Sequence, residues 1–199
     1  MLATMTWTEL LGFITGAICV WLCVKENVWN WPTGIANNIF YIVVFWQSGL
    51  YGDSLLQFIY VAIALYGWWN WLHGGAAHKR LRISRASARE MLFYAALTGV
   101  MTIVLYELLH RFTNSTVPVW DGLTTALSLI AQYMLTRKIV ENWWFWIVAD
   151  VIYIALYAYK RLFLTSLLYA IFLAMCIVGL RRWLGAVTAR GQVAKSVPA

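Results

Sequence analysis

Long apolar stretches without charged residues recur along the chain and limit what it can fold into. Each is about as long as the roughly 20-residue helix that crosses a hydrocarbon core, and 62% of the 199 residues are hydrophobic while 12% are charged. A water-soluble fold of this size could not bury so much apolar surface. We therefore predict an all-α membrane protein with transmembrane helices near 7–24, 32–48, 53–72, 91–110, 119–136, 143–159 and 163–183.

The basic residues fall between the predicted helices and predict the orientation of the chain. Twelve of the 15 Lys and Arg residues lie on the side of the segment 78–89, and Arg111, Lys160 and Arg161 lie on the other side. Because basic loops stay in the cytoplasm, we expect the N-terminus outside and the C-terminus inside. The charges do not form the continuous basic face of a nucleic-acid-binding protein, so no nucleic-acid partner is expected.

The first three predicted helices resemble the last three. The motif Glu26-Asn27-x-Trp29-x-Trp31 recurs as Glu141-Asn142-x-Trp144-x-Trp146. After a short gap, a second register aligns Tyr41 with Tyr153, Leu50 with Leu162, Ser54 with Ser166, Gly67 with Gly179 and Trp71 with Trp183. We expect two parallel three-helix repeats joined by a linker helix, a 3+1+3 arrangement that is known in transporters.

This repeat also predicts how the chain is divided. Residues 1–73 form the first repeat, 74–117 a basic cytoplasmic loop and the linker helix, 118–183 the second repeat, and 184–199 a cytoplasmic tail. Parallel repeats favour a transporter with a substrate site near the middle of the membrane. The alternative is an old duplication that only stabilises a helix bundle.

Five of the predicted helices carry rows of polar and aromatic residues at helical spacing. Polar side chains are costly in lipid, so such rows indicate a cavity or a polar contact between helices. Aromatic rings can stack on a flat ligand, and amides and hydroxyls can bind its polar groups. The candidate substrate-binding residues are Asn38, Tyr41, Gln57, Tyr60, Trp68, Asp121, Gln132, Trp146, Asp150, Tyr153, Tyr157 and Tyr169.

Other aromatic and polar residues have simpler interpretations. Trp29, Trp31, Trp143, Trp144 and Trp183 lie near predicted helix ends, where an aromatic belt at the membrane interface is expected. The mid-helix polar candidates can instead bond to a neighbouring helix. Asp121 can instead stabilise a helix N-terminus.

No sequence pattern indicates catalysis, a metal or a cofactor. The chain has no H-E-x-x-H motif and no G-x-x-x-x-G-K-[ST] loop, so we expect neither an enzyme nor an ATP-driven pump. Cys19, Cys23 and Cys176 lie in apolar runs without a C-x-x-C motif or a histidine at metal-binding spacing. We interpret them as core residues rather than as a disulfide or zinc framework.

Several ordered motifs along the chain are specific enough to indicate a family. In the first half they are Trp29-x-Trp31-Pro32-x-Gly34, Leu50-Tyr51-x-Asp53-x-x-Leu56-Gln57-x-x-Tyr60 and Tyr66-Gly67-Trp68-x-x-Trp71. In the second half they are Asp121-Gly122-Leu123-Thr124-Thr125, Gln132, Glu141-Asn142-x-x-x-Trp146 and Leu156-Tyr157-x-Tyr159-Lys160. Over residues 7 to 183 the chain resembles the nicotinamide riboside transporter family usually called PnuC.

The resemblance implies a fold similar to the SWEET sugar transporters, assembled as a homotrimer in a bacterial inner membrane. It implies facilitated diffusion of nicotinamide riboside, which a cytoplasmic kinase then traps by phosphorylation. Similar proteins carry thiamine, riboflavin or deoxynucleosides, so these substrates remain alternatives. Asp150 stands where many relatives have an amide, and its carboxylate could pair with a cationic ring or titrate in proton-coupled uptake.

Overall fold

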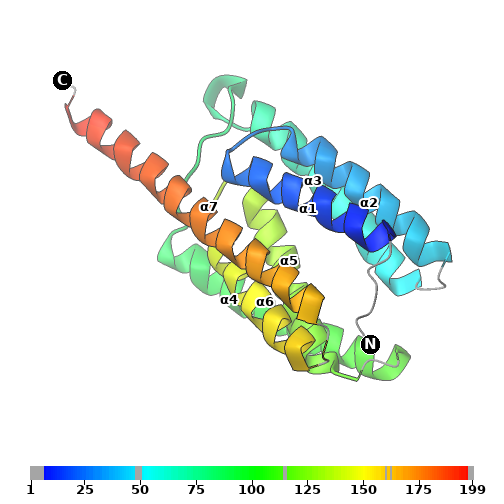
Figure 1. Ribbon diagram of the computed structural model, residues 1–199. Coiled ribbons are helices and arrows are strands. Elements are labelled where there is room, and N and C mark those ends of the chain that lie inside the picture. Colours follow the sequence, from blue (N-terminus) through cyan, green and yellow to red (C-terminus); the bar gives the residue numbers. More distant parts are fainter. Residues whose placement is uncertain (1–6, 48–50, 114–115, 160, 162, 197–199) are drawn as a thin grey trace. The chain divides into compact units, whose positions relative to one another are not determined.

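The computed structural model describes residues 7–47, 51–113, 116–159, 161 and 163–196. Within these residues the chain forms seven α-helices and one short 3-10 turn, η1 (Ala76–His78) (Figure 1). The helices are α1 (Trp7–Val24), α2 (Asn30–Gln47), α3 (Tyr51–His73), α4 (Ala88–Phe112), α5 (Pro118–Thr136), α6 (Asn142–Tyr159) and α7 (Phe163–Ser196). The predicted all-α membrane fold is confirmed, and six of the seven helices match their predicted bounds to within three residues.

Local sequence signals explain several helix ends. Ser87 caps α4 because its hydroxyl accepts a hydrogen bond from the Glu90 backbone N–H while the Glu90 side chain accepts one from the Ser87 N–H. Pro118 is the first residue of α5, where its missing N–H leaves no hydrogen bond unmade. Asn30 and Asn142 begin α2 and α6 and donate side-chain hydrogen bonds to carbonyls three residues earlier.

The predicted end of the last helix is wrong. We expected it near residue 183, but α7 continues to Ser196. Hydropathy marks where a helix leaves the membrane, whereas the hydrogen-bonded helix continues because no proline occurs between residue 163 and Pro198. At about 1.5 Å per residue, its 34 residues extend for roughly 51 Å, which exceeds a hydrocarbon core of about 30 Å.

The described helices fit a membrane environment. Three of them contain spans that are long and apolar enough to cross a bilayer: Ser54–His73, Ala88–Phe112 and Thr165–Ala189. The remaining four helices have 18 or 19 residues each. Large apolar side chains also lie on the surface, such as Leu92 at 73% and Phe112 at 77% exposure on α4. Lipid can cover these side chains at no hydrophobic cost.

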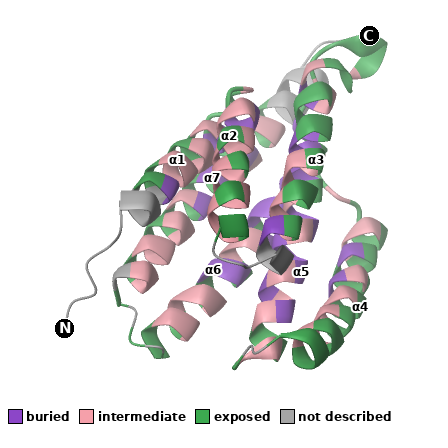
Figure 2. Ribbon diagram, turned by 90° about the vertical axis from the view of Figure 1, so that its right-hand side faces the viewer, coloured by how far each residue is buried: buried purple, intermediate pink, exposed green. Residues whose placement is uncertain are grey.

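The chain divides into two compact units, Met1–Arg82 and Ile83–Ala199. In the first unit, α2 packs against both α1 and α3. In the second unit, α4 packs on α5, α5 on α6, and α6 on α7. Figure 2 shows that buried residues are concentrated on α5 in this second unit, whose core cluster includes Leu127, Ile130 and Met134.

The turns before α2 and α6 have the same backbone geometry, and they define one repeat register. Glu26 and Lys138 both have positive φ, at 56° and 51°. The hydrogen bond from Asn27 N–H to Leu22 O in the first turn is matched by Ile139 N–H to Met134 O in the second. Equivalent residues are therefore 112 positions apart throughout, as in the second predicted register.

The first predicted register, which paired Trp31 with Trp146, is consequently wrong. The equivalent of Trp31 is Trp143. Trp31 meets Trp71 edge to face at 5.3 Å between ring centroids, and Trp143 meets Trp183 in the same way at 5.5 Å. The ring of Trp31 lies directly on Gly67, and that of Trp143 directly on Gly179.

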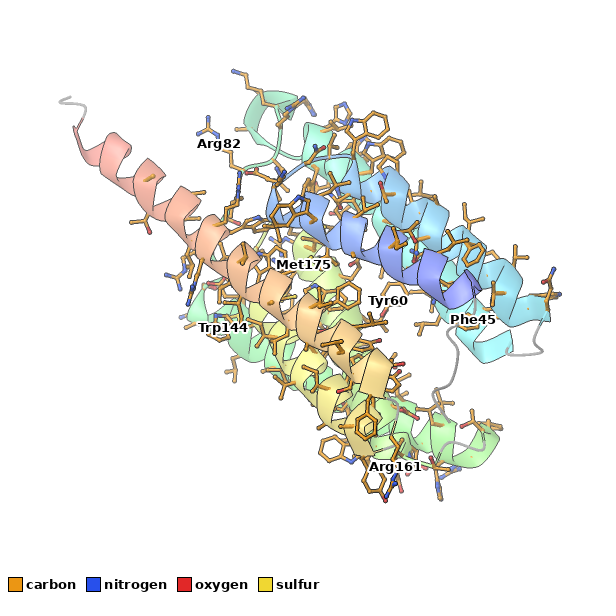
Figure 3. The ribbon with its side chains drawn as sticks, in the orientation of Figure 1. Phe45, Tyr60, Arg82, Trp144, Arg161 and Met175 are labelled. Atoms are coloured by element: carbon orange, nitrogen blue, oxygen red, sulfur yellow. The ribbon has the colours of Figure 1, made fainter. Side chains whose placement is uncertain are left out.

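The predicted interfacial position is likewise wrong for three of the tryptophans. All three are almost completely buried, because Trp31 and Trp143 each lie on a glycine of the neighbouring helix and Trp183 packs edge to face on Trp143. Trp144, in contrast, is 53% exposed and points outward (Figure 3). Leu50 and Leu162, which the sequence also aligned, lie outside the described residues, as does the side chain of Asp53.

An ionic contact joins the segment before α4 to the turn before α6. The buried Glu141 carboxylate accepts hydrogen bonds from Arg85 Nε at 3.0 Å and from the Ala86 N–H at 2.8 Å. The Ser84 N–H donates to Lys138 O, and the Val140 N–H donates to Ser84 O. The start of α4 is thereby held to the repeated turn within the second unit.

The tryptophan–glycine contact predicts a position-specific effect on stability. A Cβ at Gly179 would lie 2.6 Å from the Trp143 ring, so Gly179→Ala should lower the free energy of unfolding by about 1–2 kcal/mol. Gly185→Ala in the same helix is the matched control, because no atom lies within 4 Å of the added Cβ. Thermal unfolding in detergent should show a lower midpoint for the first variant only; equal midpoints would contradict the packing argument.

Candidate functional site

The second unit holds a buried carboxyl group between α6 and α7. Asp150 is 5% exposed, and its Oδ2 accepts a hydrogen bond from the Cys176 thiol, which is 4% exposed, at a donor–acceptor distance of 3.4 Å. Two turns earlier on α6, Trp143 packs against Gly179 of α7. Since α6 and α7 are antiparallel neighbours, this close contact also brings Cys176 within reach of Asp150.

Three tyrosines lie close together in the same unit, and we call them the tyrosine cluster (Tyr153, Tyr157 and Tyr169). The ring centroids of Tyr153 and Tyr169 are 4.6 Å apart, and those of Tyr157 and Tyr169 are 5.3 Å apart with an interplanar angle of 16°. Phe172 meets Tyr169 edge to face at 5.9 Å. All three tyrosines are half-buried, and Tyr169 is close enough to Asp150 to interact with it electrostatically.

Helix α5 adds polar groups next to the tyrosine cluster. The Tyr153 hydroxyl faces the hydroxyls of Thr124 and Ser128, and Asp121 is close enough to interact electrostatically with Tyr153 and Tyr157. Gln132 is half-buried on the same helix. Trp146 packs against the apolar core cluster around Leu127 and Phe145, together with Tyr153.

The five candidates of the first unit are more loosely arranged. Asn38, Gln57 and Tyr60 are half-buried, and Trp68 is 36% exposed. Tyr41 stacks on Phe45, near the end of α2 in Figure 3, at 5.5 Å. Its hydroxyl lies against Gly12 of α1, at a place where any side chain would collide.

Some polar residues of these sites were not among the sequence candidates. In the first unit, the Asn37 amide donates hydrogen bonds to Thr15 Oγ1 at 2.5 Å and to Gly12 O at 3.2 Å. In the second unit, Cys176 binds Asp150 although the sequence indicated only a core cysteine. A thiol in an apolar run gives no sequence signal, whereas the adjacent amides Asn37 and Asn38 could have indicated that both faces of α2 are polar.

The second unit brings together two kinds of group that attract cations, the aromatic rings of the tyrosine cluster and the Asp150 carboxyl group. Aromatic faces attract cations electrostatically, and a buried carboxylate needs a positively charged or hydrogen-bonding partner. Among the described residues, no group of three His, Cys, Asp or Glu side chains could hold a metal ion.

Comparison with known proteins identifies the family. The family model described as nicotinamide mononucleotide transporter matches residues 6–185. The chain belongs to this family. The PnuC resemblance seen in the sequence is thereby confirmed, and the protein is a membrane transporter.

Named relatives include proteins with different substrates. The chain is 28% identical to the nicotinamide riboside transporter PnuC of Escherichia coli over 96% of this chain and 91% of the relative. It is 26% identical to the riboflavin/roseoflavin transporter RibM of Streptomyces davaonensis, over 89% and 84% of the two chains. A crystal structure of the vitamin B3 transporter PnuC superposes with a TM-score of 0.71 at 27% identity, covering 92% of this chain and 83% of the other.

Proposed function

We propose that this protein carries nicotinamide riboside across the bacterial inner membrane by facilitated diffusion. The observation that supports this substrate is the buried Asp150 carboxyl group near the tyrosine cluster. The pyridinium ring of nicotinamide riboside is flat and permanently cationic, so it can stack on tyrosines while its charge pairs with the carboxylate. The nicotinamide riboside transporter relatives support the same substrate.

The remaining candidate residues are proposed to contact the substrate along its route. The hydroxyls and amides of Tyr41, Asn38, Gln57, Tyr60 and Gln132 suit ribose hydroxyls and a carboxamide, and Trp68 and Trp146 suit ring contacts. Asp121 adds negative charge beside the tyrosine cluster. Gln57→Ala and Trp146→Ala are accordingly expected to weaken binding.

The 112-residue register supports a 3+1+3 SWEET-like topology for this fold. We propose that residues 1–73 and 118–183 are the two parallel repeats, that 74–117 supply the loop and linker helix α4, and that 184–199 form a cytoplasmic tail. Each repeat then enters the membrane from the same side because α4 adds one crossing between them. The distribution of basic residues supports an outside N-terminus and a cytoplasmic C-terminus.

Continued net uptake by a facilitator requires that the substrate be chemically converted after it enters the cell. We propose that a cytoplasmic kinase phosphorylates the arriving nucleoside and so prevents its return, and that the protein itself catalyses no reaction. The exposed apolar surface of α4 is compatible with lipid and with assembly into a homotrimer.

Two alternatives follow from specific observations. The riboflavin/roseoflavin transporter relative favours a different vitamin, and thiamine, which is also cationic, or a deoxynucleoside would use the same mechanism. The buried Asp150 carboxyl group would also suit a proton-coupled transporter. Transport that is insensitive both to an imposed pH gradient and to Asp150→Asn would eliminate proton coupling.

The proposed cation recognition predicts a change in selectivity. Asp150→Asn should weaken binding of nicotinamide riboside roughly tenfold or more, since a charge-assisted contact contributes about 1.5–3 kcal/mol. Binding of the uncharged dihydronicotinamide riboside should change by less than about twofold on the same scale. Calorimetry in detergent measures both affinities, and Glu107→Gln, an exposed carboxylate paired with Arg111, is the control. Equal losses for both ligands would contradict a role for Asp150 in recognising the charge.

The proposed topology predicts a labelling pattern. Single cysteines replacing the exposed Lys25 and Arg137 should resist a membrane-impermeant maleimide in intact cells, whereas those replacing the exposed Arg111 and Arg161 should react. Disrupted cells should label at all four positions, which controls for access. Reaction of Lys25→Cys but not Arg137→Cys in intact cells would exclude parallel repeats.

A further inference from the structure

The Asp150–Cys176 contact is a feature of one repeat only. With equivalent residues 112 positions apart, Asp150 corresponds to Asn38 and Cys176 to Ala64. The first repeat thus has an amide and a methyl group where the second has a carboxyl group and a thiol. The two repeats therefore differ at both residues of this contact between neighbouring helices.

The chemistry of the four side chains explains why they differ as pairs. An amide carries its own donors and acceptor, so Asn38 can bind polar partners without help from position 64. An ionised carboxylate only accepts, and it needs a donor to fix its orientation. The Cys176 S–H supplies that donor in the second repeat, and no other donor to Asp150 occurs among the described residues.

The position of the thiol is fixed by its surroundings. Cys176 lies three residues before Gly179, whose contact with Trp143 holds α7 close to α6. Toward the other end of α7, Tyr169 packs on Tyr153, and the Ser166 hydroxyl donates to Ile154 O at 3.0 Å. The Cys176–Asp150 bond is therefore one of several contacts along the interface between α6 and α7.

We propose that Cys176 is a positioning residue that orients the Asp150 carboxylate for recognition of a cationic ring. The thiol binds Oδ2, and no donor to Oδ1 occurs among the described residues. Because a thiol is a weak donor, it can orient the carboxylate without neutralising it as an arginine or lysine would. The hydrogen bond between Cys176 and Asp150 is present without a ligand. Its effect on substrate selectivity rests on the proposed function.

The pair itself can be tested without substrate. The infrared S–H stretching band of Cys176 is obtained as the difference between wild-type protein and Cys176→Ala. We expect this band to shift in Asp150→Asn, because the carboxylate acceptor is replaced by an amide. A band at the same frequency in both proteins would overturn the proposal, whatever the protein transports.

The positioning role is tested by affinities for a charged and an uncharged ligand. Cys176→Ala should weaken nicotinamide riboside binding roughly fivefold and change dihydronicotinamide riboside binding less than about twofold, while Cys176→Ser, which keeps a donor, should restore most of the affinity for the cation. Cys23→Ala, at another buried cysteine, is the control and should change neither affinity.

The possible outcomes separate the two hypotheses. Equal weakening of both ligands by Cys176→Ala, or no rescue by serine, would overturn the positioning role. If wild-type protein binds no nicotinamide riboside, the proposed substrate fails, and the same variants tested with thiamine then decide the positioning role. The infrared result continues to decide whether the carboxylate–thiol pair exists.

Discussion

The hydrocarbon core of a membrane offers no water, so each polar group inside it must find a partner in the protein or in a ligand. This constraint explains the helical architecture, because a helix satisfies its own backbone. It also explains the side chains that begin α2 and α6, where Asn30 and Asn142 bond to the carbonyls of the preceding turn. Asp150 is different, because a carboxyl group with one weak thiol donor keeps much of its capacity to accept hydrogen bonds. Such a group is costly unless it serves a ligand.

The two repeats keep one packing scheme but differ in chemistry. The turn with positive φ, the paired tryptophans and the glycine beneath each ring occur in both units at equivalent positions. The polar faces match only in part. Gln57 and Phe45 of the first repeat correspond to Tyr169 and Tyr157 of the second, so Tyr153 is the one member of the tyrosine cluster that has a tyrosine, Tyr41, at the equivalent position. Packing limits what can change at the turn, tryptophan and glycine positions. Ligand recognition, in contrast, favours divergence at the positions of the polar faces.

Much of the fold could be predicted from the sequence because membrane thickness sets helix length and charge interrupts hydropathy. The prediction was wrong where a pattern of residue types was ambiguous. Two Glu-Asn-x-Trp-x-Trp motifs suggested a register that the backbone contradicts, since the positive φ values fall at Glu26 and Lys138. The excess length of α7 was also missed: its apolar span runs to Ala189, and the helix continues beyond that span to Ser196.

The candidate site was only partly accessible to sequence analysis. Helical spacing brought Asp150, Tyr153 and Tyr157 to one face of α6, and the structure adds Tyr169 to the two tyrosines. Helical spacing places Cys176 in one row with Tyr169 and Phe172, but its bond to Asp150 could not be predicted, because that bond depends on a neighbouring helix. Trp146 shares the spacing of that face, and both Trp146 and Tyr153 pack on the apolar core cluster of the second unit. Spacing predicts which residues share a face but not what lies opposite them.

Flux through the purified protein tests the central claim most directly. Liposomes containing the protein, without nucleotide or ion gradient, should take up radiolabelled nicotinamide riboside faster than protein-free liposomes until the inner and outer concentrations are equal. This result would establish a facilitator that requires no energy source. Uptake no faster than in protein-free liposomes, with the protein folded by thermal unfolding, would contradict the account.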